Sequence, residues 1–140
     1  MGWKRRPTGF IPVVEGELNA MTRAIALQAL TGVIERSPVG NPGNWKSPAP
    51  PGYVGGAFRG NHAVSVNTVD PSYDTAKIDE TGQATTAAGA GKIGSARNPY
   101  QIIYIQNNLP YSEELEDGYS GQAPQGVYQV TFDSLRAATE

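Results

Sequence analysis

The sequence predicts an α+β domain in which a long N-terminal helix and a C-terminal helix pack on a small, mainly antiparallel sheet. Three observations lead to this fold class. Apolar residues recur at helical spacing early in the chain, two short strand-like runs begin near residues 62 and 100, and glycine and proline imply long loops. Glycine and proline number 17 and 11 among 140 residues. A chain of this length forms about one domain, so we expect residues 1–140 to share one core.

The first helix is predicted from the run PVVEGELNAMTRAIALQALTGVIERS. Pro12 suits its first turn, and the Ser37-Pro38 pair ends it, because a residue before proline avoids the α conformation. Apolar residues step along the run by three and four positions and predict a buried face. They are Val14, Leu18, Met21, Ile25, Leu30, Val33 and Ile34.

Residues 37–60 are predicted to form an extended Gly/Pro-rich arm, since 11 of the 24 are glycine or proline and no regular element is expected there. Trp45, Tyr53 and Phe58 are rings of a kind that a disordered linker rarely holds. We therefore expect the arm to be ordered and to lie on its own domain or on a neighbouring subunit.

Two strands are predicted next. The run NHAVSVNTV at residues 61–69 alternates as a half-buried strand does, and YQIIYIQ at residues 100–106 predicts a more apolar one. Between them, 13 of the 16 residues at positions 81–96 are Gly, Ala, Ser or Thr. This segment is either a flexible loop or a weak helix of small residues.

The segment GAGKIG at residues 89–94 has the glycine spacing of a dinucleotide-binding loop. That chemistry requires a strand directly before the loop and a helix directly after it, so that backbone N–H groups meet the pyrophosphate. Neither is predicted here, and Ile93 follows Lys92 where a P-loop carries Ser or Thr. We expect no nucleotide site and no cofactor.

His62 is the only histidine of the chain. Ser65 follows three residues later, which suggests a nucleophile and base, but positions three apart in a strand point to opposite faces. One histidine and no cysteine cannot supply the three protein ligands of a catalytic zinc. The sequence therefore predicts no catalytic residue and no transition-metal site.

Composition narrows the class of protein further. The absence of cysteine excludes disulfides and suits a reducing cytoplasm as the place of synthesis. No apolar run reaches the roughly 18 residues of a membrane span, and the basic N-terminus lacks the apolar region of a signal peptide. We expect a soluble, unprocessed protein that contacts no membrane.

Charge is divided unevenly along the chain. Residues 1–60 carry seven bases and three acids, 7 − 3 = +4, and residues 61–140 carry four bases and ten acids, 4 − 10 = −6. Opposite charge on the two halves would favour contact within one chain or between successive copies in a head-to-tail ring, and chance segregation of solvated charges is the alternative.

Four acids lie within the run EELED at residues 113–117. Asn108 is predicted to cap a short helix at residues 109–117, Pro110 to occupy its first turn, and Gly118 to end it. Tyr111 and Leu115 are four positions apart and should pack inward. Glu113, Glu116 and Asp117 should face water or a basic partner. A calcium loop would need ligands at alternate positions around a glycine, which this run lacks.

The run IYIQNNLPYSEELEDGYSGQAPQGV resembles the signature of the neck and tail-completion (head-tail joining) proteins of tailed bacteriophages. In that signature a strand leads into Asn-Asn-x-x-Tyr, then Leu-Glu-x-Gly, and then a Ser-x-Gln-Ala-Pro-x-Gly turn that opens a final helix. The motif residues include Asn108, Tyr111, Leu115, Glu116, Gly118, Gln122 and Pro124. Upstream, the helix that ends in SPV and the segment GGAFRGN also resemble the family.

The resemblance implies a structural virion protein and not an enzyme. It would form a homo-oligomeric ring at the head-tail junction, join the capsid connector to the tail, and leave a channel through which DNA passes without sequence-specific binding. The ring is expected to be sixfold, with a twelvefold ring as the alternative. The resemblance also favours a terminal helix from about Pro124 to Thr139.

Two further expectations concern contacts. Lys4, Arg5 and Arg6 form a basic arm that could touch DNA in the channel, but three cations are few for a DNA-binding protein, so an acidic neighbouring subunit is the preferred partner. The rival function is a small carbohydrate-binding module or hydrolase that uses the acidic helix 113–117 and the aromatic residues of the arm.

Overall fold

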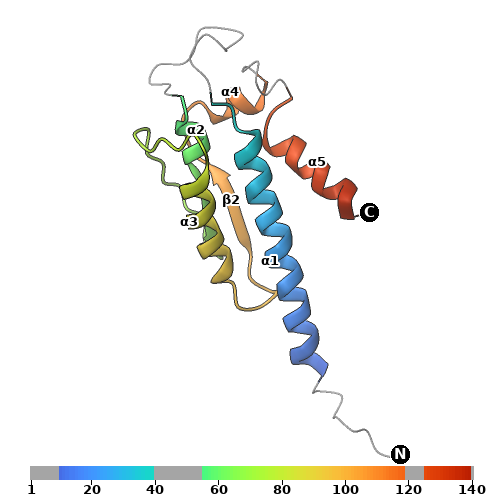
Figure 1. The fold of residues 1–140 in the computed structure, drawn as a ribbon. Coiled ribbons are helices and arrows are strands. Elements are labelled where there is room, and N and C mark those ends of the chain that lie inside the picture. Colours follow the sequence, from blue (N-terminus) through green and yellow to red (C-terminus); the bar gives the residue numbers. More distant parts are fainter. Residues whose placement is uncertain (1–9, 40–54, 119–124, 140) are drawn as a thin grey trace, which may run out of the picture.

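The computed structural model describes residues 10–39, 55–118 and 125–139. The architecture is α+β, as the sequence predicts: α1 and α3 lie side by side against a two-stranded antiparallel sheet, and α5 packs beside the C-terminal end of α1 and diverges from it (Figure 1). In chain order the elements are α1 (Phe10–Arg36), α2 (Ala57–Gly60), β1 (His62–Val66), α3 (Gln83–Gly94), β2 (Ile103–Asn107), α4 (Ser112–Glu116) and α5 (Tyr128–Thr139).

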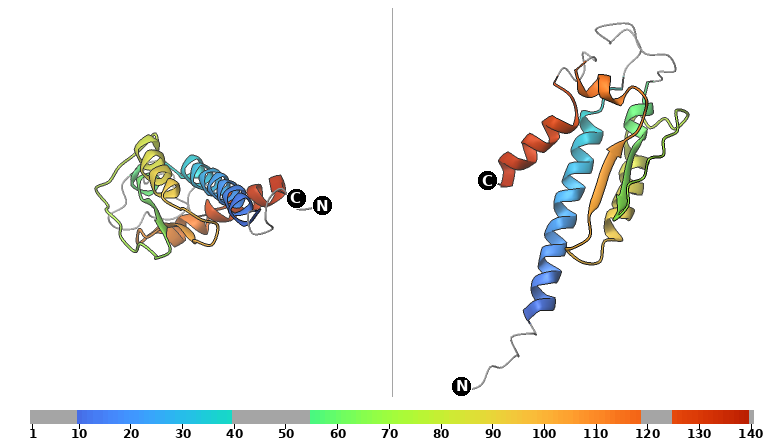
Figure 2. Two further views of the ribbon diagram at one scale, coloured as in Figure 1. Left: turned by 90° about the horizontal axis from the view of Figure 1, so that it is seen from below. Right: turned by 180° about the vertical axis from the view of Figure 1, so that it is seen from behind.

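The two strands pair with His62 opposite Asn107 and Val66 opposite Ile103. His62 and Val64 are buried, and alternate residues of a strand point to opposite faces, so one face of the sheet meets the helices. Seen from behind, both strands lie in front of α1 and α3, which shows that the two helices cover the same face (Figure 2).

The core has two adjoining clusters, and Ile105 of β2 packs against both. The first holds Val33, Ala57, Phe58, Leu109, Tyr111, Leu115 and Val127. The second holds Ala26, Leu30, Ile34, Val64 and Ile93. Because α1 contributes to both clusters, its C-terminal half is the central element of the domain.

The buried face predicted for the first helix is confirmed only in its C-terminal half. Leu30, Val33 and Ile34 are at most 3% exposed. The other four positions, which we call the α1 stripe, are exposed instead: Val14 49%, Leu18 44%, Met21 60% and Ile25 43%.

The direction of the stripe around α1 explains why the prediction was wrong for these four residues. At about 100° per residue, Leu18 lies roughly 120° around the helix from Leu30. Asn19 and Ala26 lie on the Leu30 side and are buried, at 8% and 9% exposed. A helix of 27 residues is about 40 Å long, whereas α3 with 12 residues is about 18 Å long and a five-residue strand about 17 Å. The first turns of α1 therefore extend past the strands and α3, as Figures 1 and 2 show.

The C-terminal end of the predicted Gly/Pro-rich arm is helical and not extended. Residues 57–60 form the short helix α2, although no regular element was expected there. Phe58 is 2% exposed and packs edge-on to His62, so its ring belongs to the core of its own chain and is not a contact for a neighbour or DNA. Trp45 and Tyr53 lie outside the described residues.

The segment that the sequence left open as loop or helix is the helix α3. Asp79 holds its first turn, because the Asp79 carboxylate accepts hydrogen bonds from the N–H of Gly82 at 3.0 Å and the N–H of Thr85 at 2.8 Å. Small residues suit the helix because it lies close to its neighbours. A Cβ atom placed on Gly89 would lie 2.4 Å from Leu30 and 3.0 Å from Val64.

No helix among the described residues is both long and apolar enough to cross a membrane.

Candidate functional site

The motif residues that carry the family resemblance serve the fold of this chain. Tyr111 and Leu115 are 2% and 0% exposed and pack inward, as predicted. Gly118 has a φ of 85°, the left-handed conformation expected of a residue that ends a helix, and its N–H donates to Leu115 C=O at 3.1 Å. Gln122 and Pro124 lie outside the described residues.

Asn108 does not cap the short helix, contrary to prediction. The helix α4 begins at Ser112 after Tyr111, and no side chain caps it. The Asn108 amide instead donates to the backbone C=O of Asp70 at 2.9 Å and of Ser72 at 3.0 Å. Asn108 therefore holds the segment that follows β1 against the end of β2.

Glu116 was expected to face water or a basic partner, and this prediction is wrong. Its carboxylate accepts hydrogen bonds from three successive backbone N–H groups at the start of α5, at 2.8 to 2.9 Å. Those groups belong to Val127, Tyr128 and Gln129 and have no partner within the helix. A carboxylate at a helix N-terminus is also favoured by the helix dipole. Glu116 thus joins α4 to α5.

Gly126 makes this arrangement possible. Its φ is 88°, and a Cβ atom at this position would lie 2.5 Å from the Glu116 backbone oxygen and 2.9 Å from Oε1. Any side chain would separate the carboxylate from the helix. The Leu-Glu-x-Gly motif and the later glycine therefore form one structural unit, in which one residue supplies the acceptor and another leaves it room.

His62 is the centre of a buried polar network. Its Nε2 lies 2.5 Å from Ser37 Oγ, and its Nδ1 lies 2.7 Å from the Tyr128 hydroxyl. Ser37 Oγ donates to Val33 C=O at 2.6 Å, so it accepts a hydrogen bond from Nε2–H, and Tyr128 donates to Nδ1. The histidine is therefore the neutral Nε2–H tautomer, and it joins the end of α1 to β1 and α5.

The electrostatics agree with a neutral histidine. Burial, assisted by the positive charge of Arg59, lowers the pKa of His62 from 6.5 to about 3. Burial and the Glu116 charge raise the pKa of Tyr128. His62 and Ser37 are 4% and 2% exposed, so a substrate could not reach the pair, and the serine proton is already donated to the backbone.

Sequence reasoning missed this network. Its members are 25 and 66 residues apart along the chain, and no periodic pattern relates them. His62 and Ser65 lie on opposite faces of β1, as the sequence predicts. The tertiary partner of His62 is Ser37, for which the sequence predicts only a role at the end of the first helix.

The GAGKIG segment lies inside α3, so it cannot form a phosphate-binding loop. Gly89 is buried against α1 and β1, whereas Gly91 and Gly94 have open space around them. Among the residues that the structure describes, no group of three His, Asp or Glu side chains could hold a metal ion.

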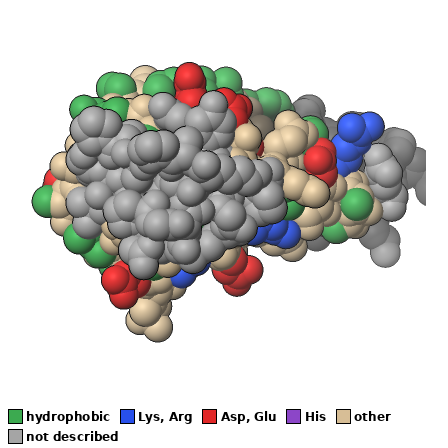
Figure 3. All heavy atoms as spheres, turned by 90° about the horizontal axis from the view of Figure 1, so that it is seen from above, with side chains coloured by type: hydrophobic (Ala, Val, Ile, Leu, Met, Phe, Trp, Pro, Cys, Tyr) green, Lys and Arg blue, Asp and Glu red, His purple; other side chains and the backbone are tan. Residues whose placement is uncertain are grey.

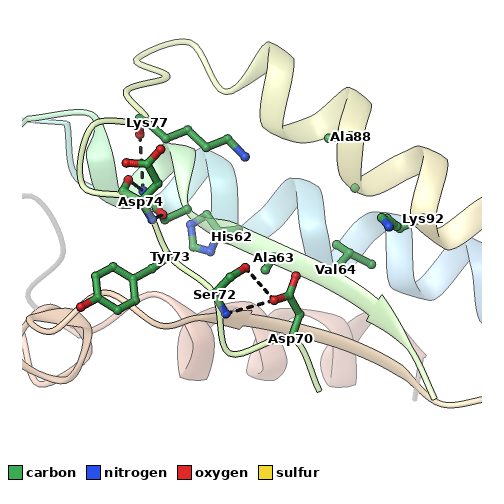
Figure 4. A pocket seen from close by; sticks show the side chains of 12 residues that line it. His62, Ala63, Val64, Asp70, Ser72, Tyr73, Asp74, Lys77, Ala88 and Lys92 are labelled. Atoms are coloured by element: carbon green, nitrogen blue, oxygen red, sulfur yellow. Dashed lines mark hydrogen bonds between the residues drawn. The ribbon is translucent and has the colours of Figure 1, made fainter. Parts of the chain in front are cut away.

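A polar hollow of about 320 Å³ lies between β1, the segment 70–77 and α3 (Figure 4). Asp70, Asp74, Lys77 and Lys92 line it, so its charges are mixed. Hydrogen bonds from Ser72 lower the pKa of Asp70, and this carboxylate is already engaged at 2.6 and 3.0 Å. We assign this hollow no ligand.

The α1 stripe is the candidate interaction surface. Gly32, seven positions after Ile25 and on the same side of the helix, is buried against Thr131 of α5. The face that carries the stripe is thus covered by α5 at its C-terminal end and uncovered where α5 diverges from α1 (Figure 1).

The opposite side of the N-terminal half is held to the domain. Asn19 Nδ2 donates to Ala96 C=O at 3.2 Å, and Arg23 Nε donates to the same oxygen at 2.8 Å. Tyr100 donates to Glu15. The exposed stripe therefore sits on a helix whose position is set by polar contacts.

The charge split of the sequence does not become two charged sides on the face seen from above. There, acidic and basic side chains are interspersed around the rim (Figure 3). Lys4, Arg5 and Arg6 lie outside the described residues. A scan of protein-family models, a search of curated proteins and a search of solved structures each found no match to this chain.

Proposed function

We propose that this protein is a structural subunit of the neck of a tailed phage. It forms a ring at the head-tail junction, joins the capsid connector to the tail, and leaves a channel for DNA. The ring is sixfold, with twelvefold as the alternative. The proposal starts from the resemblance of residues 103–127, and the observation that supports it in the fold is the uncovered α1 stripe.

The stripe supplies what a ring interface needs. Four large apolar side chains, each 43 to 60% exposed, follow one another along about three turns of α1. Covering the exposed half of such a side chain contributes about 1 kcal/mol, so the stripe alone contributes about 4 kcal/mol to each contact between subunits. A helix face is a surface that a different face of the next subunit can cover, as a closed ring requires.

The motif residues support a scaffold more than a chemical site. Glu116 is bound by three N–H groups of its own chain, and Tyr111 and Leu115 are buried. The rival carbohydrate-binding module or hydrolase would use this acidic helix together with the aromatic residues of the arm. Of the residues it requires, Glu116 is bound by the backbone of α5 and Phe58 is buried in the core, and no observation favours that function.

A gene deletion tests the proposal. In the phage that encodes this chain, we expect the deletion to yield filled heads and separate tails in electron micrographs, and we expect the wild-type gene supplied in trans to restore joined particles. Joined, infectious particles without the protein would overturn the proposal, and so would a virion reconstruction that places the chain away from the head-tail junction.

A further inference from the structure

One edge of the sheet is open. Asn67 N–H donates to Ile102 C=O at 2.8 Å, and the register continues as Val66 opposite Ile103. In an antiparallel ladder the pairs that exchange hydrogen bonds alternate, so Ser65 and Tyr104 form the next such pair. The N–H and C=O groups of Ile103, Ile105 and Asn107 therefore point away from β1. Within the described residues, no strand pairs with this edge of β2.

A groove borders the same edge. It has a volume of about 260 Å³ and lies between β2, α4 and the first turn of α5. Ile105 and Tyr128 form its apolar part above the buried ring of Phe58, and Glu113 and Glu116 add negative charge. An open row of N–H and C=O groups beside an apolar groove is the arrangement by which sheet edges bind an extended segment.

The negative charge of the groove indicates which segment binds there. Among the residues that the structure describes, no Lys or Arg lines the groove. Glu113 and the adjacent Asp117 are exposed, and Glu116 is held at the groove wall. The matching segment of this chain is Trp3-Lys4-Arg5-Arg6, because it offers a large apolar ring next to three cations, and it has a backbone N–H at every position.

The segment cannot reach the groove of its own chain. The groove lies beside the Phe58 cluster, which α1 meets at Val33, 23 residues and about 35 Å along the helix from Phe10. Trp3 lies seven positions before Phe10, and a chain of seven residues spans at most about 25 Å. The occupant must therefore come from another copy.

We infer that the groove beside the open edge of β2 binds residues 3–6 of a second copy of this chain as an added strand. Main-chain hydrogen bonds to Ile103 and Ile105 hold the strand, Trp3 fills the apolar part, and the cations meet Glu113 and Asp117. This contact links the far end of α1 in one subunit to the α4 end of the next, which is a head-to-tail arrangement. It needs a second copy, as the proposed ring does, but it does not require a virion.

The first experiment uses the absence of cysteine in the natural sequence. Full-length Lys4→Cys and Glu113→Cys proteins are mixed under mild oxidation. We expect a disulfide-linked heterodimer, and we expect at least about fivefold less product when Glu17→Cys, an exposed acid on the N-terminal half of α1, replaces Glu113→Cys. Equal yields with the two partners would overturn the inference.

The second experiment tests the strand pairing itself. A fluorescent peptide of residues 1–9 is titrated with the full-length protein and followed by anisotropy. In an added strand only alternate N–H groups face β2. N-methylation of one alternate pair, Trp3 with Arg5 or Lys4 with Arg6, should therefore weaken binding by about tenfold or more, and methylation of the other pair by less than about threefold.

A charge variant of the groove and a scrambled peptide complete the binding test. Glu113→Gln should weaken peptide binding about two- to fivefold, and Glu17→Gln should leave it unchanged. Equal binding of a peptide with the same composition in scrambled order, or equal effects of the two methylation patterns, would show electrostatic attraction only and overturn the inference. Such a failure would leave the gene-deletion result, and hence the neck proposal, unaffected.

Discussion

At the residue scale, carboxylates that precede a helix in the chain hold its first turn in two places. Glu116 does so for α5, and Asp79 for α3. Desolvation opposes the charge of Asp79, but hydrogen bonds from Thr85 and Gly82 outweigh it and lower its pKa. Both carboxylates accept hydrogen bonds from backbone N–H groups at the start of a helix, although the sequences around them have nothing in common.

Replacing Glu116 by Ala should lower the free energy of unfolding by about 1 to 3 kcal/mol, because three N–H groups at the start of α5 lose a charged acceptor. Glu113→Ala is the matched control on the same helix and should change stability by less than about 0.5 kcal/mol, because that side chain is exposed. Urea unfolding measures both variants. Equal stabilities would contradict the assigned role of Glu116.

His62 predicts a specific pH dependence. The folded protein keeps it neutral down to about pH 3, whereas the unfolded chain protonates it below about pH 6.5. The unfolded state therefore binds the additional proton between these values, and stability falls as the pH is lowered from 6.5, by about 1.4 kcal/mol per pH unit.

Unfolding measured at pH 5 and at pH 7 in wild type and in His62→Gln tests this dependence. The variant should be less stable at pH 7 but should lose less stability between the two values. The imidazole should show Nε2–H in nitrogen NMR spectra. An imidazole that titrates near pH 6.5 in the folded protein would contradict the buried neutral state.

At the scale of elements, the packing of α3 against α1 and β1 depends on one glycine. Gly89→Ala should destabilise the protein by about 1 to 3 kcal/mol, because the new Cβ would meet Leu30 at 2.4 Å and overpack the core. Gly91→Ala, two residues later, meets nothing within 4 Å and should stabilise the protein by up to about 1 kcal/mol through helix propensity. Thermal unfolding compares the two, and equal shifts would refute close packing at Gly89.

At the scale of the whole molecule, the α1 stripe should decide assembly and not folding. Leu18→Asp should prevent head-tail joining when the variant is supplied to the deletion phage, while circular dichroism and the unfolding temperature stay close to wild type. Leu27→Asp is the matched control, because Leu27 is similarly exposed, 42% against 44%, and lies on the opposite side of the helix. Equal loss of joining in both variants would show that the stripe has no specific role.

The sequence by itself determined the elements whose causes are local. Helical periodicity and the Ser37-Pro38 stop placed α1, alternation placed β1, and Tyr111, Leu115 and Gly118 were assigned correctly from spacing and turn chemistry. It also reduced the small-residue segment 81–96 to two possibilities, because composition alone does not show whether glycine packs against a neighbour.

Only the tertiary structure decided which surfaces are covered. Leu18 and Leu30 were both predicted to be buried, but they lie roughly 120° apart around α1. The rest of the domain covers the Leu30 side, where Asn19 is 8% exposed and donates to Ala96, and leaves Leu18 44% exposed. Likewise Glu116 carries the same charge as Glu113, and only the approach of α5 past Gly126 makes it a helix acceptor. Periodicity reports which side of an element is apolar, whereas burial depends on the length and position of what packs against it.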